Sequence, residues 1–309
     1  MTPKDKRPVI IGSRGSDLAL WQANRVKSDL EAHYSGPIEI KVIKTKGDQI
    51  DNLAFSKIEG KGFFTREIED ALLAREIDIA VHSLKDLMTT QPQGLRIGAV
   101  GYRADRRDIL LVREEAYEQG GVIPVRQGAV IGSGSMRRQC QIAYFNPSLE
   151  IRDLRGNVPT RVNKLRDGQY DAIVIAAAGV KRLNLNLTGL RTIFLDAELF
   201  LPAPGQGLLA IQLREDDPEV EYAITGLGSE QARIEAELER GLLARFNSGC
   251  SLPLGVCSQI KRETFRLSAM LGVSKDDGWD TPRRVDITGN DVGEVVDRCY
   301  RGLTSAPEA

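Results

Sequence analysis

Buried strands that end in small residues and lead into helices recur along this chain, and they constrain its fold more than any other feature. The apolar stretches at residues 8–12, 130–132 and 172–176 each run into glycine, serine or alanine before an amphipathic segment begins. Short apolar runs with such boundaries are typical of buried strands. Strands that alternate with helices form mainly parallel sheets covered by helices. We therefore predict an α/β fold.

The alternation occurs twice and is followed by a different pattern. Strands and helices alternate over residues 8–81, and the pattern restarts near residue 129 after a charged segment. From residue 229 onward, a long helix is followed by period-two segments and a last helix over 291–303, which indicates a small α+β region. We expect three domains, formed by residues 1–103 with 204–226, by residues 104–203, and by residues 229–309.

The composition is that of an ordinary soluble protein, with 309 residues, 41% of them hydrophobic and 28% charged. No run reaches the roughly 18 apolar residues of a membrane span. The start lacks the apolar core of a signal peptide, so we expect a cytoplasmic protein. The four cysteines, which are Cys140, Cys250, Cys257 and Cys299, lack zinc-site spacing, so we expect reduced thiols and no metal.

Positive charge is concentrated in the middle of a nearly neutral chain. The formal net charge is −1, yet residues 120–200 carry 11 basic and 6 acidic side chains. Residues 201–309 carry 12 basic and 18 acidic side chains. An excess of positive charge in one part of a neutral protein favours a small anionic ligand over a nucleic acid.

Arginines follow the predicted strands at four places. They are Arg14, Arg137 with Arg138, Arg155 with Arg161, and Arg182. Helix N-termini attract anions, and guanidinium groups bind carboxylates through paired hydrogen bonds. Arg137 and Arg138 fall in a first helical turn, where cations oppose the helix dipole. We interpret these arginines as a site for a ligand with several carboxylates, and the alternative is a set of surface arginines.

The stretch at residues 78–86 (DIAVHSLKD) changes abruptly from apolar to polar. Chemistry in α/β proteins gathers at the carboxyl ends of strands, which here brings Lys85 and Asp86 to such an end. The alternative is a strand that simply ends in solvated residues. Residues 52–64 are rich in glycine and lysine, and we interpret them as a mobile lid or a plain solvated loop.

These motifs together resemble the hydroxymethylbilane synthase family, also called porphobilinogen deaminase. The resemblance covers nearly the whole chain in the family's order and spacing. It rests on SRGSDLALWQ (13–22), GKGFF (60–64), DIAVHSLKD (78–86), SMRRQCQ (135–141), LRGNVPTR (154–161), AGVKRL (178–183), PGQG (204–207) and SGCSLP (248–253). It implies two domains like type II periplasmic binding proteins on either side of a cleft, with a small α+β third domain.

The resemblance also implies an activity and a cofactor. The family joins four porphobilinogen molecules with loss of ammonia and then hydrolyses off the linear tetrapyrrole hydroxymethylbilane. Its dipyrromethane cofactor is held by a thioether, and the family's cysteine falls on Cys250. The family's catalytic aspartate falls on Asp86, whose carboxylate can stabilise the azafulvenium cation left by ammonia. His82 and Ser83 are expected to be structural.

Further site residues follow from the same resemblance. Cofactor contacts fall on Lys85, Asp86, Gly134, Ser135, Arg137 and Arg138. Substrate contacts fall on Arg14, Ser16, Lys57, Lys61, Phe64, Arg155, Arg161, Arg182 and Gln206. The family also suggests a monomer with porphobilinogen as its small-molecule substrate. A rival from another class is a non-catalytic carboxylate-binding protein, which the arginines alone do not exclude.

The chain departs from the family pattern at four positions. Asp17, Met88 and Arg106 stand where proline is usual, and Gly134 stands where serine is usual. We expect Gly134 to lose one hydrogen bond to the cofactor. Met88 and Arg106 are expected to alter the local backbone without changing the site residues.

Overall fold

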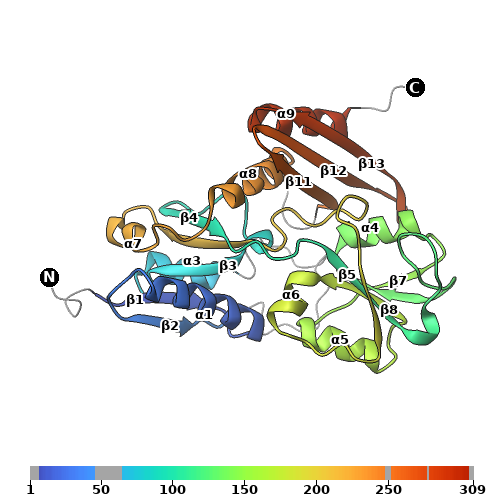
Figure 1. Ribbon diagram of the computed structural model, residues 1–309, viewed down its shortest axis with the longest axis horizontal. Coiled ribbons are helices and arrows are strands. Elements are labelled where there is room, and N and C mark those ends of the chain that lie inside the picture. Colours follow the sequence, from blue (N-terminus) through green and yellow to red (C-terminus); the bar gives the residue numbers. More distant parts are fainter. Residues whose placement is uncertain (1–6, 46–64, 248–251, 277, 306–309) are drawn as a thin grey trace. The chain divides into compact units, whose positions relative to one another are not determined.

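The computed structural model describes residues 7–45, 65–247, 252–276 and 278–305, and these belong to two compact units (Figure 1). The chain passes from unit 1 to unit 2 between Ala104 and Asp105, and it returns between Gln206 and Gly207. It leaves unit 1 again after Arg233. Among the described residues, no helix is long and apolar enough to span a membrane.

Unit 1 is built on a five-stranded sheet with the order β2-β1-β3-β10-β4. Its strands are β1 (Val9–Ser13), β2 (Ile38–Val42), β3 (Ile79–Ser83), β4 (Leu95–Gly101) and β10 (Leu209–Arg214). Its helices are α1 (Asp17–Glu31), α3 (Arg66–Leu73) and α7 (Pro218–Ala223), and the 3-10 turn η3 (Leu84–Asp86) follows β3. Strands β1, β2 and β3 are parallel, whereas β10 is antiparallel to β3 and β4.

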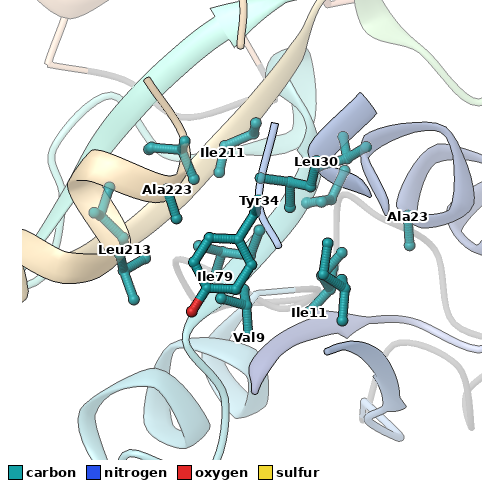
Figure 2. Close-up of a cluster of buried hydrophobic side chains, with 14 of the residues drawn as sticks. Val9, Ile11, Ala23, Leu30, Tyr34, Ile79, Ile211, Leu213 and Ala223 are labelled. Atoms are coloured by element: carbon teal, nitrogen blue, oxygen red, sulfur yellow. The ribbon is translucent and has the colours of Figure 1, made fainter. Parts of the chain in front are cut away.

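A helix covers each face of this sheet because successive side chains of a strand point to opposite faces. Ile11 of β1 and Ile79 of β3 pack against Leu30 of α1 in one cluster (Figure 2). Ala80, the next residue of β3, packs on the other side with Leu72 of α3. These two apolar layers hold the carboxyl ends of β1 and β3 in place.

Unit 2 contains a second five-stranded sheet, with the order β7-β6-β8-β5-β9. Its strands are β5 (Asp108–Arg113), β6 (Val130–Gly132), β7 (Glu150–Arg152), β8 (Ala172–Ala176) and β9 (Leu190–Phe194). Its helical segments are η4 (Glu114–Ala116), α4 (Met136–Phe145), α5 (Val158–Arg166) and α6 (Ala177–Arg182). Strands β6, β7 and β8 are parallel, and β5 is antiparallel to β8 and β9.

The two five-stranded sheets share one design. In each, the chain forms three parallel strands linked by helices, and the fourth position is taken by an antiparallel strand. That strand is β10 in unit 1 and β5 in unit 2, and each is the first strand after the chain enters the unit from the other one. The predicted α/β class is confirmed, but both sheets are mixed, because one of the five strands in each runs opposite to the other four.

The C-terminal part of unit 2 is an antiparallel sheet covered by two helices. The strands are β11 (Leu254–Lys261), β12 (Thr264–Lys275) and β13 (Gly278–Gly289), and the helices are α8 (Glu230–Arg245) and α9 (Val292–Thr304). One apolar cluster joins Leu242 of α8, Leu267 of β12 and Val296 of α9. This is the predicted α+β region, drawn in orange to red in Figure 1. The division of unit 2 into two domains stays a prediction.

Candidate active site

One pocket of unit 1 gathers residues from the ends of two neighbouring parallel strands. Because β1 and β3 pair in parallel, their carboxyl ends meet at one edge of the sheet. Arg14 and Ser16 follow β1, and Asp86 lies in η3 directly after β3. All three line a pocket of about 80 Å³. The structure therefore brings together three of the residues that the sequence predicted.

Local hydrogen bonds hold the walls of this pocket. The Ser16 hydroxyl caps α1 by accepting from the backbone N–H of Ala19 at 3.4 Å. Gln22 of α1 donates from Nε2 to the Ser83 hydroxyl at 2.9 Å, which ties the helix to the end of β3. Lys85 lies in η3 beside the exposed Asp86.

Unit 2 has the corresponding edge, and most of the predicted arginines lie there. The carboxyl ends of β6, β7 and β8 are followed by the segments that carry Arg137 and Arg138, Arg155 and Arg161, and Arg182. Strand β5 runs the opposite way, so it begins at this edge, and its first residue Asp108 pairs with Ala176 at the end of β8. The sheet thus places a buried carboxylate among the arginines.

Asp108 pairs with both arginines of α4. Its carboxylate accepts from Arg137 Nη1 and from Arg138 Nη2, each at 2.8 Å, and all three side chains are buried. Burial alone would raise the pKa of the Asp108 carboxyl, but the two guanidinium charges outweigh it and hold that pKa well below its usual range. Arg137 and Arg138 are therefore neutralised in part within the protein, which their helix position alone did not reveal.

This cluster keeps an excess of positive charge. One carboxylate faces two guanidinium groups, and Gln206 donates to Asp108 from Nε2 at 2.9 Å, adding no charge. Arg137 Nε is buried without a hydrogen-bond partner among the described residues. Buried donors are nearly always paired, so an unpaired N–H beside an uncompensated charge suits an anionic ligand. A carboxylate of a bound cofactor fits that chemistry.

Sequence comparison identifies the chain's relatives. The family model described as "Porphobilinogen deaminase, dipyromethane cofactor binding domain" matches residues 9–222, and the one described as "Porphobilinogen deaminase, C-terminal domain" matches residues 233–296. The chain belongs to the porphobilinogen deaminase family. The porphobilinogen deaminase of Sulfurimonas denitrificans is 43% identical over 313 residues, covering 98% of each chain. That of Syntrophobacter fumaroxidans is 40% identical, covering 96% of this chain and 97% of its own.

Comparison with solved structures adds little to this assignment. The periplasmic aliphatic sulphonate binding protein SsuA from Escherichia coli aligns with 79% of this chain and 71% of its own. Its TM-score is 0.43 at 15% sequence identity. Membership of the porphobilinogen deaminase family therefore rests on sequence and not on this likeness.

Two of the remaining predicted arginines, Arg155 and Arg161, have partners within their own segments. Arg155 Nε donates to Asp153 at 3.0 Å, and Arg161 Nε donates to the Gly156 carbonyl at 2.7 Å. Burial lowers the pKa of Arg182 to about 10, which still leaves its guanidinium charged at neutral pH. The family assignment of these residues to substrate carboxylates stays a prediction.

Gly134 and Ser135 occupy the turn before α4. A Cβ atom at position 134 would lie 2.8 Å from the Leu154 carbonyl oxygen and 3.1 Å from Asp153 Oδ1. The backbone here therefore has no room for the serine that is usual in the porphobilinogen deaminase family. Ser135 stands at the N-cap of α4, but its side chain makes no capping hydrogen bond.

Arg106, another departure from the family pattern, joins the start of β5 to the C-terminal sheet and helix. Its guanidinium contacts Glu235 at 3.0 Å and Glu239 at 3.4 Å, both on α8, and donates to the Ser258 carbonyl of β11 at 2.6 Å. The two glutamates are buried. Arginine therefore supplies contacts here that a proline could not.

Several predicted site residues lie outside the described part of the chain. They are Lys57, Lys61, Phe64 and Cys250. Cys140, Cys257 and Cys299 are buried free thiols, as expected of small apolar side chains. Among the described residues, no group of histidine, cysteine and acidic side chains could hold a metal ion.

Proposed function

We propose that this chain is a hydroxymethylbilane synthase. It condenses four porphobilinogen molecules head to tail with loss of ammonia, and it then releases the linear tetrapyrrole by hydrolysis. The observation that carries the proposal is the match to porphobilinogen deaminases over nearly the full length of both chains. The pocket that joins Asp86 to Arg14 supports it, because it offers one carboxylate and one guanidinium to the same ligand.

Asp86 is assigned the chemical role. When the aminomethyl C–N bond of porphobilinogen breaks, the electron pair leaves with ammonia, and the pyrrole ring becomes an azafulvenium cation. A carboxylate at this point stabilises the developing positive charge. It can also accept the proton that the attacking pyrrole carbon loses when the new C–C bond forms. Asp86 is exposed, lines the pocket and forms no ion pair with any residue that the structure describes, so it is suited to both tasks.

The arginines are assigned to substrate and cofactor carboxylates. Each pyrrole ring carries an acetate and a propionate, and guanidinium groups bind such carboxylates in pairs of hydrogen bonds. We assign Arg14, with Ser16, to substrate in unit 1. In unit 2 we assign Arg137 and Arg138 to the dipyrromethane cofactor, with Ser135 beside them. That cofactor, attached at Cys250, supplies the pyrrole carbon on which the chain grows.

The other site residues that the resemblance predicted are also part of the proposal. Lys85 and Gly134 are proposed at the cofactor, and Arg155, Arg161, Arg182 and Gln206 at the substrate. Gln206 donates to the Arg106 carbonyl and to Asp108, so it also holds the carboxylate that pairs with Arg137 and Arg138. A monomeric state and a cytoplasmic location stay predictions.

Release of ammonia from porphobilinogen tests the proposed function. The purified chain should release ammonia from porphobilinogen and form hydroxymethylbilane, and an Asp86→Asn variant should do so far more slowly. Binding of porphobilinogen without ammonia release would contradict the proposal and favour the rival carboxylate-binding protein.

A further inference from the structure

The pocket of unit 1 has a second polar wall that the proposed chemistry does not use. Besides Arg14 and Asp86, it is lined by Thr65, which precedes α3, and by His82 of β3. Both side chains are buried, with exposed fractions of 2% for Thr65 and 6% for His82. Buried polar side chains normally have hydrogen-bond partners, so the partners of these two residues are informative.

The His82 ring is held from behind by Gln212. His82 Nε2 lies 3.1 Å from Gln212 Oε1 on the neighbouring strand β10. The other end of the Gln212 amide lies 3.2 Å from Glu69 Oε1 and 2.8 Å from Gln91 Oε1. Gln91 is oriented in turn, because its Nε2 donates to the Met88 carbonyl at 2.7 Å.

These contacts determine which ring nitrogen carries the proton. Carboxylate and amide oxygens only accept, so the amide nitrogen of Gln212 must face Glu69 and Gln91. The Gln212 oxygen then faces His82 and accepts from an N–H at Nε2. In a neutral ring, the other nitrogen, Nδ1, is left with a free lone pair.

The ring is neutral at the pH where such an enzyme works. Burial lowers the pKa of His82 to about 4, an effect that the bond to Gln212 only partly offsets and that the charge of Arg14 increases. Nδ1 therefore offers a hydrogen-bond acceptor without charge. It is too weak a base to remove a proton from an ammonium group at neutral pH.

Two groups in the pocket wall are left without partners. Nδ1 of His82 makes no hydrogen bond to any residue that the structure describes. Thr65 stands at the N-cap of α3, yet its hydroxyl makes no capping bond, and Oγ1 has no partner within the described part of the chain. One acceptor and one hydroxyl thus line the same small pocket as Asp86 and Arg14.

We propose that His82 is a substrate-binding residue whose Nδ1 accepts a hydrogen bond from an N–H of porphobilinogen. The Thr65 hydroxyl forms part of the same wall and makes a second polar contact to that substrate. Gln212 is a positioning residue that acts through His82 by keeping the proton on Nε2. The proposal rests on the proposed function, and it replaces the expectation that His82 is only structural. A neutral acceptor can form a hydrogen bond with an N–H of porphobilinogen. It forms no ion pair with the ammonium group of porphobilinogen, which must leave as ammonia.

Two substitutions of His82 separate binding from packing. His82→Asn keeps an amide oxygen near the position of Nδ1 and loses the contact to Gln212, whereas His82→Gln keeps a donor near Nε2 and loses the acceptor. We expect His82→Gln to lower kcat/KM for porphobilinogen by roughly tenfold to a hundredfold, with a smaller loss in His82→Asn. The reverse order would show that the contact to Gln212 is what matters and would overturn the proposal.

A spectroscopic measurement on the unaltered holoenzyme keeps the test independent of folding. The chain has two histidines, and His33 is an exposed internal control. After labelling with ¹⁵N-histidine, His82 should show a protonated Nε2 and an unprotonated Nδ1, and excess porphobilinogen should shift the Nδ1 signal while His33 stays unchanged. A protonated Nδ1 in the free enzyme would overturn the proposal. So would an Nδ1 chemical shift that does not change when porphobilinogen is added and turned over.

Gln212 has a matched control in Gln91. Gln212→Met removes the amide that fixes the ring, so both tautomers should appear and kcat/KM should fall. Gln91→Met leaves the bonds of Gln212 to His82 and Glu69 in place, so the tautomer should persist. Unchanged tautomers in Gln212→Met would contradict the positioning role.

Failure of the proposed function can be distinguished from failure of this inference. If the wild-type enzyme released no ammonia, the proposed function would be wrong. If the enzyme were active but the His82 signal did not respond to porphobilinogen, only the inference about His82 would be wrong.

Discussion

Asp86 is the residue on which the proposed chemistry depends, and its setting makes a clean test possible. It lies exposed in η3, so a substitution there should leave the core intact. We expect Asp86→Asn to lower kcat by roughly 10²- to 10⁴-fold, because the stabilising negative charge is lost. The free energy of unfolding should change by less than about 0.5 kcal/mol. Turnover assays and urea unfolding check both parts, and near-parental turnover would rule out the assigned role.

His82 makes a distinct prediction about acid stability. Its pKa of about 4 in the folded chain lies below the ordinary value of 6.5, so the unfolded chain binds a proton more readily. Its contribution is complete above pH 6.5 and is lost as the pH falls toward 4, a change of about 3 kcal/mol at most. Of the residues that the structure describes, the charged groups that share its surroundings are Arg14, Glu69 and Asp86.

Urea unfolding at several pH values checks this prediction. The wild-type free energy of unfolding should fall more steeply between pH 6.5 and 4 than that of His82→Asn. The exposed His33 provides the control, since His33→Asn should keep the wild-type slope. Equal slopes in wild type and His82→Asn would mean that folding does not lower the pKa of His82.

Asp108 is expected to matter for stability as well as for the cofactor. Removing its charge in Asp108→Asn leaves Arg137 and Arg138 buried without a counterion. We expect the free energy of unfolding to fall by about 3–5 kcal/mol, as for other broken buried ion pairs. Chemical denaturation measures this loss. Glu114→Gln, which breaks an exposed pair with Arg191, is a matched control and should unfold like the wild type.

At the scale of single helices and strands, the site residues that local sequence patterns position could be predicted, and those held by distant contacts could not. The strand ends and helix starts that carry Arg14, Ser16 and Asp86 follow from local patterns, since apolar runs, small residues and a serine cap are visible in the sequence. Asp108 was missed as a site residue because its partners lie on α4, about thirty residues away. The only signal was an acidic residue at the first position of an apolar strand.

Other elements were missed for the same physical reason. Strand β9 was not predicted, and the period-two segments expected after residue 229 did not define the bounds of β11 or β13. Exposed and partly buried residues alternate along most of β13. Its strand conformation therefore depends on hydrogen bonding to β12 rather than on local composition. Likewise, the orientation of the His82 ring depends on Gln212 of β10, far away in sequence.

Arg106 offers a test at the level of packed elements. It bridges the start of β5 to α8 and β11, and Glu235 and Glu239 are buried beneath it. We expect Arg106→Met to lower the free energy of unfolding by about 3 kcal/mol, because two carboxylates lose their cation. Arg107→Met, on the partly exposed neighbour, should have little effect in the same denaturation experiment. Equal stability of the two variants would show that the bridge contributes nothing.

At the scale of the whole molecule, the chain uses one sheet design twice. In both five-stranded sheets four strands run in one direction, and the fourth position holds the single opposite strand, which is the first strand after the chain enters from the other unit. No long sequence repeat reveals this, because the shared features are strand order and direction rather than side chains. The design explains why both units present charged residues at the carboxyl ends of their parallel strands.

The most direct test of the central claim is the mass of the intact protein. The account predicts that the purified chain carries the covalent mass of a dipyrromethane, which Cys250→Ala lacks. Porphobilinogen should add further species, each heavier by one substrate molecule less ammonia. An active enzyme that shows only the mass of its amino-acid sequence would contradict the account.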